Sequence, residues 1–183
     1  MAWEQVTRWT DWDGEGLEHL SVVQDDDGIV AESLVIGQRE TKRYGLHYRL
    51  GIDPGWRVRH VSIQMVNGPK LQLLCDDLGH WSDMDGAELT QLAGCIDVDI
   101  AATPFTNTLP IRRLDLAIGE ARTLKVAYVL PPELDVRAVE QRYTRLAESR
   151  FLYEGLSTGF SAELDVDDHG IVKDYPGVFR LLP

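Results

Sequence analysis

The sequence predicts a mainly β protein in which a many-stranded antiparallel sheet, curved or rolled into a half-barrel, wraps around a single short helix. Two observations carry this prediction: turn signals recur at short intervals, and the segments between them alternate between apolar and polar residues. A long antiparallel sheet twists and has open edges, so it curls or closes instead of lying flat. The concave face that results suits an apolar ligand.

Turns are indicated wherever Asp or Asn residues stand close to a Gly. Gly reaches positive φ without steric cost, and Asp or Asn side chains hydrogen-bond the backbone of the turn. The connections are short, which favours antiparallel hairpins, because a parallel crossover needs a dozen or more residues. The turn sequences lie at 25–28, 53–55, 67–69, 76–79 and 167–170.

Alternation is strictest in residues 160–167, where every second side chain from Phe160 to Val166 is apolar and those between are polar or acidic. A period of two is typical of a sheet with one wet face. Residues 44–52 repeat the pattern, with aliphatic residues or Tyr at the even positions from 46 to 52. Further strands are expected at 17–24, 29–37, 56–66 and 70–75, and at 125–130 with both faces buried.

Two segments depart from the strand pattern. Thr103 followed by Pro104 is typical of a helix N-cap and first helical position. Pro110 would break a long helix, so the helix that follows is expected to be short or kinked. Residues 136–147 have apolar side chains at helical spacing but also tolerate an extended conformation; since Tyr and Thr favour strands, we interpret the segment as a strand.

Length and charge narrow the class of protein. The 183 residues are expected to form a single domain, 1–183, and 44% hydrophobic residues suffice for a core. A net charge of −12 argues against a nucleic-acid partner and against electrostatic docking on anionic lipid. We find neither a signal peptide nor a run of about 18 apolar residues, so we expect no transmembrane segment and a cytoplasmic location.

Motifs for cofactors and metals are not evident. The sequence has no nucleophile elbow, no phosphate-binding loop and no dinucleotide-binding glycine pattern, and its five His residues are scattered. Cys75 and Cys95 are expected to be buried structural thiols. We therefore expect no cofactor and no metal.

Two acidic residues in the segment 95–100 are candidates for chemistry. On a regular strand Cys95, Asp97 and Asp99 would share one face, with the two carboxylates about 7 Å apart. That spacing could suit an acid and a base flanking a water, or a divalent cation. Alternatively, the carboxylates face solvent or pair with Arg112 and Arg113. The sequence leaves these readings open.

Short polar side chains fill the segment between the two acids and the two arginines. They are Thr103, Thr106, Asn107 and Thr108, interrupted by Phe105. Hydroxyl and amide groups beside an apolar cavity would suit a polar head group, but they would equally satisfy the backbone of an irregular loop. The forked guanidinium groups of the arginines suit carboxylates, phosphates or sugar hydroxyls, and also ordinary surface charge.

Four runs together resemble the bacterial glycolipid-binding family, formerly a domain of unknown function. They are GCIDVDIAATPFTNTLPIRRL at 94–114, QRYTRL at 141–146, DWDGEGLEHL at 11–20 and DYPGVFRLL at 174–182. The resemblance implies a many-stranded antiparallel sheet around one helix, a tight homodimer, and a fold similar to periplasmic lipoprotein carriers and a mycobacterial glycolipid carrier. It brings no catalytic residues to positions in this chain.

We therefore expect non-enzymatic binding or carriage of a glycolipid or other lipid-like molecule, with its acyl part on the concave face. The expected contacts to the ligand are Asp97, Asp99, Phe105, Thr106, Asn107, Arg112 and Arg113. One alternative is an enzyme that acts on a sugar or lipid head group with Asp97 and Asp99 as acid and base. Another is a structural homodimer in which residues 94–114 fill the interface.

Overall fold

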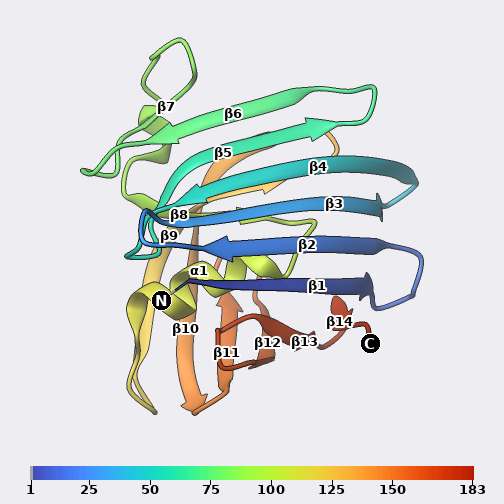
Figure 1. Ribbon diagram of the computed structural model, residues 1–183, viewed down its shortest axis with the longest axis vertical. Coiled ribbons are helices and arrows are strands. Elements are labelled where there is room, and N and C mark those ends of the chain that lie inside the picture. The colour runs from blue at the N-terminus through green and yellow to red at the C-terminus, as the bar shows by residue number, and fades with distance from the viewer. Residues whose placement is uncertain (1) are drawn as a thin grey trace.

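The computed structural model describes residues 2–183 and places fourteen strands in one continuous curved sheet (Figure 1). The first seven strands are β1 (Trp3–Asp11), β2 (Leu17–Gln24), β3 (Ile29–Arg39), β4 (Lys42–Ile52), β5 (Val58–Met65), β6 (Lys70–Cys75) and β7 (Trp81–Ser82). The others are β8 (Cys95–Ile100), β9 (Ala121–Leu130), β10 (Asp135–Ala147), β11 (Arg150–Gly155), β12 (Phe160–Val166), β13 (Val172–Tyr175) and β14 (Phe179–Leu181). The helical segments are η1 (Thr90–Leu92), η2 (Phe105–Asn107) and α1 (Thr108–Leu114).

The sheet consists of two wings joined by the first and last strands of the chain. Its spatial order is β7-β6-β5-β4-β3-β2-β1-β14-β13-β12-β11-β10-β9-β8, so β1 pairs with β14 in the interior of the sheet. The axes of strands β1–β6 lie nearly horizontal in Figure 1, the strands β9–β11 of the second wing lie across them, and α1 lies between the wings. The predicted mainly β, curved sheet around a short helix is confirmed.

Neighbouring strands are antiparallel, as predicted, except at one edge. There β8 pairs with β9 in parallel, and the crossover between them contains α1. A parallel pair needs such a long connection, whereas the remaining pairs are joined by turns or short loops or, for β1 and β14, by the curl of the whole sheet. The crossover brings the polar segment 101–114 across the concave side.

The ambiguous segment 136–147 is a strand, as we interpreted it. It forms most of β10, which pairs with β9 on one side and β11 on the other. Its two neighbours satisfy the backbone on both sides, which outweighs the helical spacing of its apolar residues. Gln141 and Tyr143 point inward and are buried.

The predicted short helix is present, but α1 begins only at Thr108, after the one-turn segment η2, so Asn107 and not Thr103 occupies its N-cap position. The Oγ1 atom of Thr103 accepts a hydrogen bond from the backbone N–H of Phe105, with 3.0 Å between the heavy atoms. Pro110 falls in the first turn of the seven-residue helix α1, where a backbone N–H has no partner within the helix. Asp115 adopts a left-handed conformation (φ 43°) and ends the helix.

One prediction about β8 was wrong. The register of β8 against β9 shifts between Cys95 and Asp97, so Ile96 is an extra residue in the strand. Cys95 consequently packs in the apolar core together with Val98 and Ile100, instead of sharing a face with Asp97. An insertion of one residue reverses the facing of everything before it, and the alternation of the sequence alone does not reveal it.

The space between the wings is largely filled by side chains. Trp9, Tyr48 and Phe105 are among the completely buried residues, and Leu109 of α1 joins the same core cluster. Both thiols are free and buried, as predicted, and burial raises the pKa of Cys75 and of Cys95 to about 11. None of the helices within residues 2–183 has the length and apolar character to cross a membrane.

Candidate ligand-binding cavity

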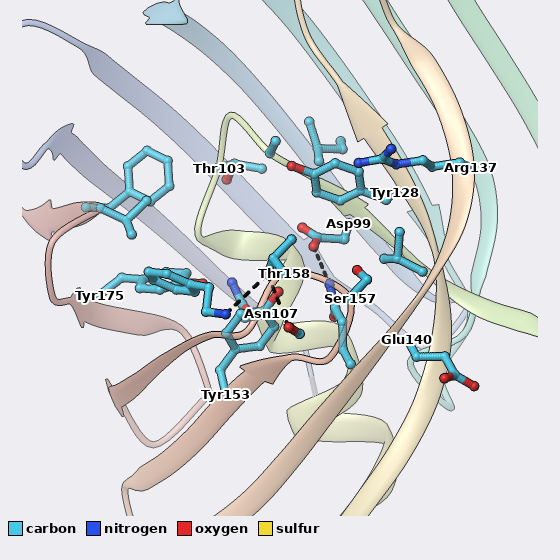
Figure 2. Close-up of a pocket in the computed structure, with 18 residues that line it drawn as sticks. Asp99, Thr103, Asn107, Tyr128, Arg137, Glu140, Tyr153, Ser157, Thr158 and Tyr175 are labelled. Carbon is cyan, nitrogen blue, oxygen red and sulfur yellow. Dashed lines mark hydrogen bonds between the residues drawn. The ribbon is translucent and has the colours of Figure 1, made fainter. Parts of the chain in front are cut away.

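A cavity of about 330 Å³ opens between η2 and strands β9–β14 on the concave side of the sheet (Figure 2). Residues from the end of β8, from η2 and from six neighbouring strands contribute to its wall. Its volume is at the lower end of the range of roughly 300–1,000 Å³ that is usual for small-molecule sites. The cavity therefore suits a ligand of ring size better than a whole lipid.

Aromatic rings form one wall of the cavity. Tyr153, Phe160, Tyr175 and Phe179 come from β11, β12, β13 and β14, one ring from each neighbouring strand. Their ring centroids lie 5.9–6.3 Å apart between contacting pairs, at tilted or edge-to-face angles. Such packing fixes the rings and leaves apolar faces toward the cavity. Phe160 is 42% exposed, which places it at the mouth.

Hydrogen-bonded polar groups form the opposite wall. Asp99 accepts a hydrogen bond from Nε2 of Gln141 at 2.5 Å, drawn in Figure 2, and another from Oγ1 of Thr106 at 3.2 Å. Burial raises the pKa of Asp99, and these two hydrogen bonds oppose the rise. Asn107 accepts a hydrogen bond from the hydroxyl of Tyr143 at 2.8 Å. The polar wall is thus held in a fixed orientation before any ligand arrives.

Charged and hydroxyl groups surround the mouth. The guanidinium of Arg137 lies 5.7 Å from the ring centroid of Tyr128, and Figure 2 shows the two side chains together. Glu140 points away from the rings in the same view, while Ser157 and Thr158 lie on the turn between β11 and β12. These exposed groups can hydrogen-bond the polar parts of a ligand at the mouth of the cavity.

The structure brings only part of the predicted site together. Asp99 and Asn107 line the cavity, and Thr106 supports Asp99 from behind. Phe105 is completely buried in the apolar core and is absent from the cavity wall. Arg112 lies elsewhere, with its guanidinium 5.3 Å from the ring centroid of Trp56.

Asp97 and Arg113 form a buried ion pair, which is one of the two structural alternatives raised by the sequence. Nε and Nη2 of Arg113 donate to the two carboxylate oxygens of Asp97, at 3.1 and 2.5 Å. The Asp97 side chain is inaccessible to solvent and that of Arg113 is 13% exposed. Burial raises the pKa of Asp97, and the guanidinium counteracts it. The pair links β8 to α1 and does not line the cavity.

Several cavity residues escaped the sequence analysis. The residues are Tyr128, Gln141, Tyr153, Phe160, Tyr175 and Phe179. Each aromatic residue was visible at an apolar position of its segment, but its convergence with the others depends on the order of β11–β14 in the sheet. The detectable signal was the concentration of Tyr and Phe residues in the C-terminal third of the chain.

Comparison with known proteins yields one family and one solved structure. A family model described as "Putative glycolipid-binding" matches residues 6–181. The crystal structure of a DUF1089 family protein from Pseudomonas aeruginosa is similar, with a TM-score of 0.78 and 38% sequence identity over 99% of this chain and 92% of that chain. No curated protein matches. Since the family model spans nearly the whole sequence, the chain belongs to the family described as putative glycolipid-binding.

Proposed function

We propose that this protein binds the sugar-like head group of an amphiphile in the aromatic cavity without transforming it. The observation that carries the proposal is the arrangement of the wall: four rings from β11–β14 face a fixed set of carboxylate and amide groups. A sugar ring presents apolar C–H faces and a rim of hydroxyls, which match rings on one side and hydrogen-bonding groups on the other. The name of the family supports a ligand of this kind.

The position of the ligand differs from the sequence-based expectation. That expectation put the acyl part inside the curl and the head group at the rim. The core side chains between the wings occupy the space that an acyl chain would need. We therefore place the head group in the cavity and the first methylenes of the chain against Phe160 at the mouth. Each methylene removed from water there would contribute roughly 0.8 kcal/mol.

The geometry favours binding over the enzyme that the sequence allowed. An acid and a base must both reach the reacting atoms, but Asp97 is absent from the cavity wall and both of its oxygens are engaged by Arg113. Asp99 is engaged by Gln141 and Thr106. The homodimer implied by the resemblance stays part of the proposal.

Titration of an alkyl glycoside below its micellar concentration tests the proposal. We expect n-octyl glucoside to bind the wild-type protein in isothermal calorimetry, and Phe160→Ala to weaken it several-fold because an apolar contact at the mouth is lost. Leu156→Ala is the matched control: Leu156 lies on the same β11–β12 turn, is 43% exposed and does not line the cavity.

Two results would contradict the proposal. One is the absence of binding across a panel of alkyl glycosides together with the absence of any co-purified amphiphile in native mass spectrometry. The other is an equal loss of affinity in the Phe160 and Leu156 variants, since the contact would then not be specific to the cavity.

A further inference from the structure

A second cavity, of about 170 Å³, lies on the other side of Phe179. Residues Ala101, Val178 and Phe179 line both cavities and separate them, while the rest of the second wall comes from Ala102, from β1–β4 and from the turn between β1 and β2. Among the described residues of this wall there are two carboxylates, Asp11 and Glu18, and no Lys, Arg or His. The second cavity is therefore acidic.

Glu18 has an unsatisfied oxygen in this wall. It lies on the inward face of β2, beside Leu20 along the strand, and is only 2% exposed. Its Oε1 atom accepts hydrogen bonds from the hydroxyls of Ser33 and Tyr48, both at 2.8 Å. Within residues 2–183 its Oε2 atom has no partner. A buried acceptor without a donor is costly, so it marks a place where a donor belongs.

Tyr44 and Asp11 lie in the same cavity wall as Glu18. Burial raises the pKa of the Tyr44 hydroxyl, and the charges of Asp11 and Glu18 raise it further, so both carboxylates act on this group. Gly37 leaves room for the hydroxyl, because a Cβ atom there would lie 2.8 Å from it. Arg39 is the one cation that acts on Tyr44, and its Nη2 atom is engaged by Glu133 at 2.5 Å.

We propose that the second cavity is a binding site for a primary ammonium group, with Glu18 as its anionic partner. An ammonium has three donors and a positive charge, and the wall offers Glu18, Asp11 and the Tyr44 hydroxyl as acceptors. A neutral hydroxyl would satisfy one acceptor but would leave the two carboxylates uncompensated. This site goes beyond the proposed function, since the aromatic cavity can be filled while the acidic one is vacant.

The protonation state of Glu18 leads to a second prediction, which concerns how the affinity for the ammonium depends on pH. Burial raises the pKa of Glu18 to about 7, and the hydrogen bonds from Tyr48 and Ser33, together with the nearby hydroxyl of Thr103, only partly oppose the rise. An ammonium binds the ionised form, so below pH 7 binding must first remove a proton. Because the apparent affinity scales with the ionised fraction, it should be about tenfold weaker at pH 6 than at pH 8. A primary amine stays protonated throughout that range.

The experiment compares n-butylammonium chloride with n-butanol at constant ionic strength. Two-dimensional NMR follows the backbone amides of Gly16 and Gly37, which line the second cavity. We expect saturable shifts with the ammonium, at least tenfold weaker binding of the alcohol, and the stated loss of affinity at pH 6. These three readouts use the wild-type protein alone, so they do not depend on how any variant folds.

Glu18→Gln removes the charge and keeps the shape, so we expect it to weaken the ammonium at least tenfold and to abolish the pH dependence. Glu32→Gln is the control, because Glu32 is an exposed glutamate on the outer face of β3 and its replacement removes one negative charge equally. Equal binding of butanol, no saturable shift, or wild-type affinity in Glu18→Gln would each overturn the proposal. Octyl glucoside binding should persist in Glu18→Gln, so a failure here is distinct from a failure of the aromatic site.

Discussion

Glu18 is the residue at which local sequence rules and structure disagree most. A carboxylate at an inward position of β2, beside the buried Leu20, destabilises the fold, since burial penalises its charged form. Three hydroxyls lower that cost but do not remove it. Ordinary surface acids need no such support, and residues that break the inside–outside rule are more often retained for binding than for stability.

The same residue makes the stability of the protein depend on pH. The pKa of Glu18 is about 7 in the folded state and 4.5 ordinarily, so between these values the folded state holds more protons than the unfolded state. The free energy of unfolding therefore falls as pH rises through this window, by an amount on the order of 3 kcal/mol from Glu18 alone. In Glu18→Gln we expect this contribution to be absent.

Urea unfolding of the wild type and of Glu18→Gln at pH 4.5 and pH 8 measures this effect. We expect the variant to gain stability relative to the wild type as the pH rises. The other buried acids, including Asp97 and Asp99, titrate in both proteins and cancel in the difference. A stability difference that is the same at both pH values would show that Glu18 titrates ordinarily.

At the scale of elements, α1 is attached to the sheet by the Asp97–Arg113 pair. A helix of seven residues has little intrinsic stability, so its position depends on tertiary contacts. The bidentate pair supplies one such contact from β8, and Leu109 supplies another by packing in the core. Because η2 runs directly into α1, this attachment also holds Asn107 at the cavity wall.

Removing one partner of the Asp97–Arg113 ion pair should lower the free energy of unfolding. Arg113→Met leaves the Asp97 carboxylate buried without a counter-charge, and we expect a loss of about 3–5 kcal/mol in the free energy of unfolding, measured in urea. Arg112→Met is the control, because that side chain is exposed and we expect less than about 1 kcal/mol. The double variant Asp97→Asn/Arg113→Met should recover part of the loss; no recovery would mean that the arginine acts through packing.

The elements also show what the sequence could predict. Period-two alternation identified β4 and β12 because each strand exposes one face, which is a local property. The short helix followed from Thr103 and Pro110, again locally. Of the residues that line the proposed site, Asp99 and Asn107 were candidates from the sequence because they lie in a conspicuous polar run. The extra residue at Ile96 and the convergence of four rings arise from strand pairing, which no local pattern encodes.

At the scale of the whole molecule, the two ends of the chain meet in the interior of the sheet. Trp9 of β1 faces Leu181 of β14 in the register, and the Trp9 indole also donates a hydrogen bond to the carbonyl of Val172 at 2.8 Å. The β1–β14 pair joins the wing that contains the acidic cavity to the wing that contains the aromatic one. Both cavities therefore depend on contacts between residues at opposite ends of the sequence.

A truncation at Pro176 tests how far this joint holds the molecule together. The shortened chain lacks β14, so β1 and β13 each lose a partner and the short strand β14 can no longer bridge the wings. We expect the midpoint of thermal unfolding to fall by at least about 10 °C, which corresponds to a few kcal/mol for a chain of this length. Removal of Pro183 alone is the control, since this residue lies beyond β14.

In the chain truncated at Pro176, amide hydrogen exchange should be accelerated in β1 far more than in β5, which lies four strands away in the same wing. Uniform acceleration would instead indicate that the sheet unfolds as one cooperative unit, and unchanged exchange in β1 would show that the two wings are joined by the core and not by this strand pair.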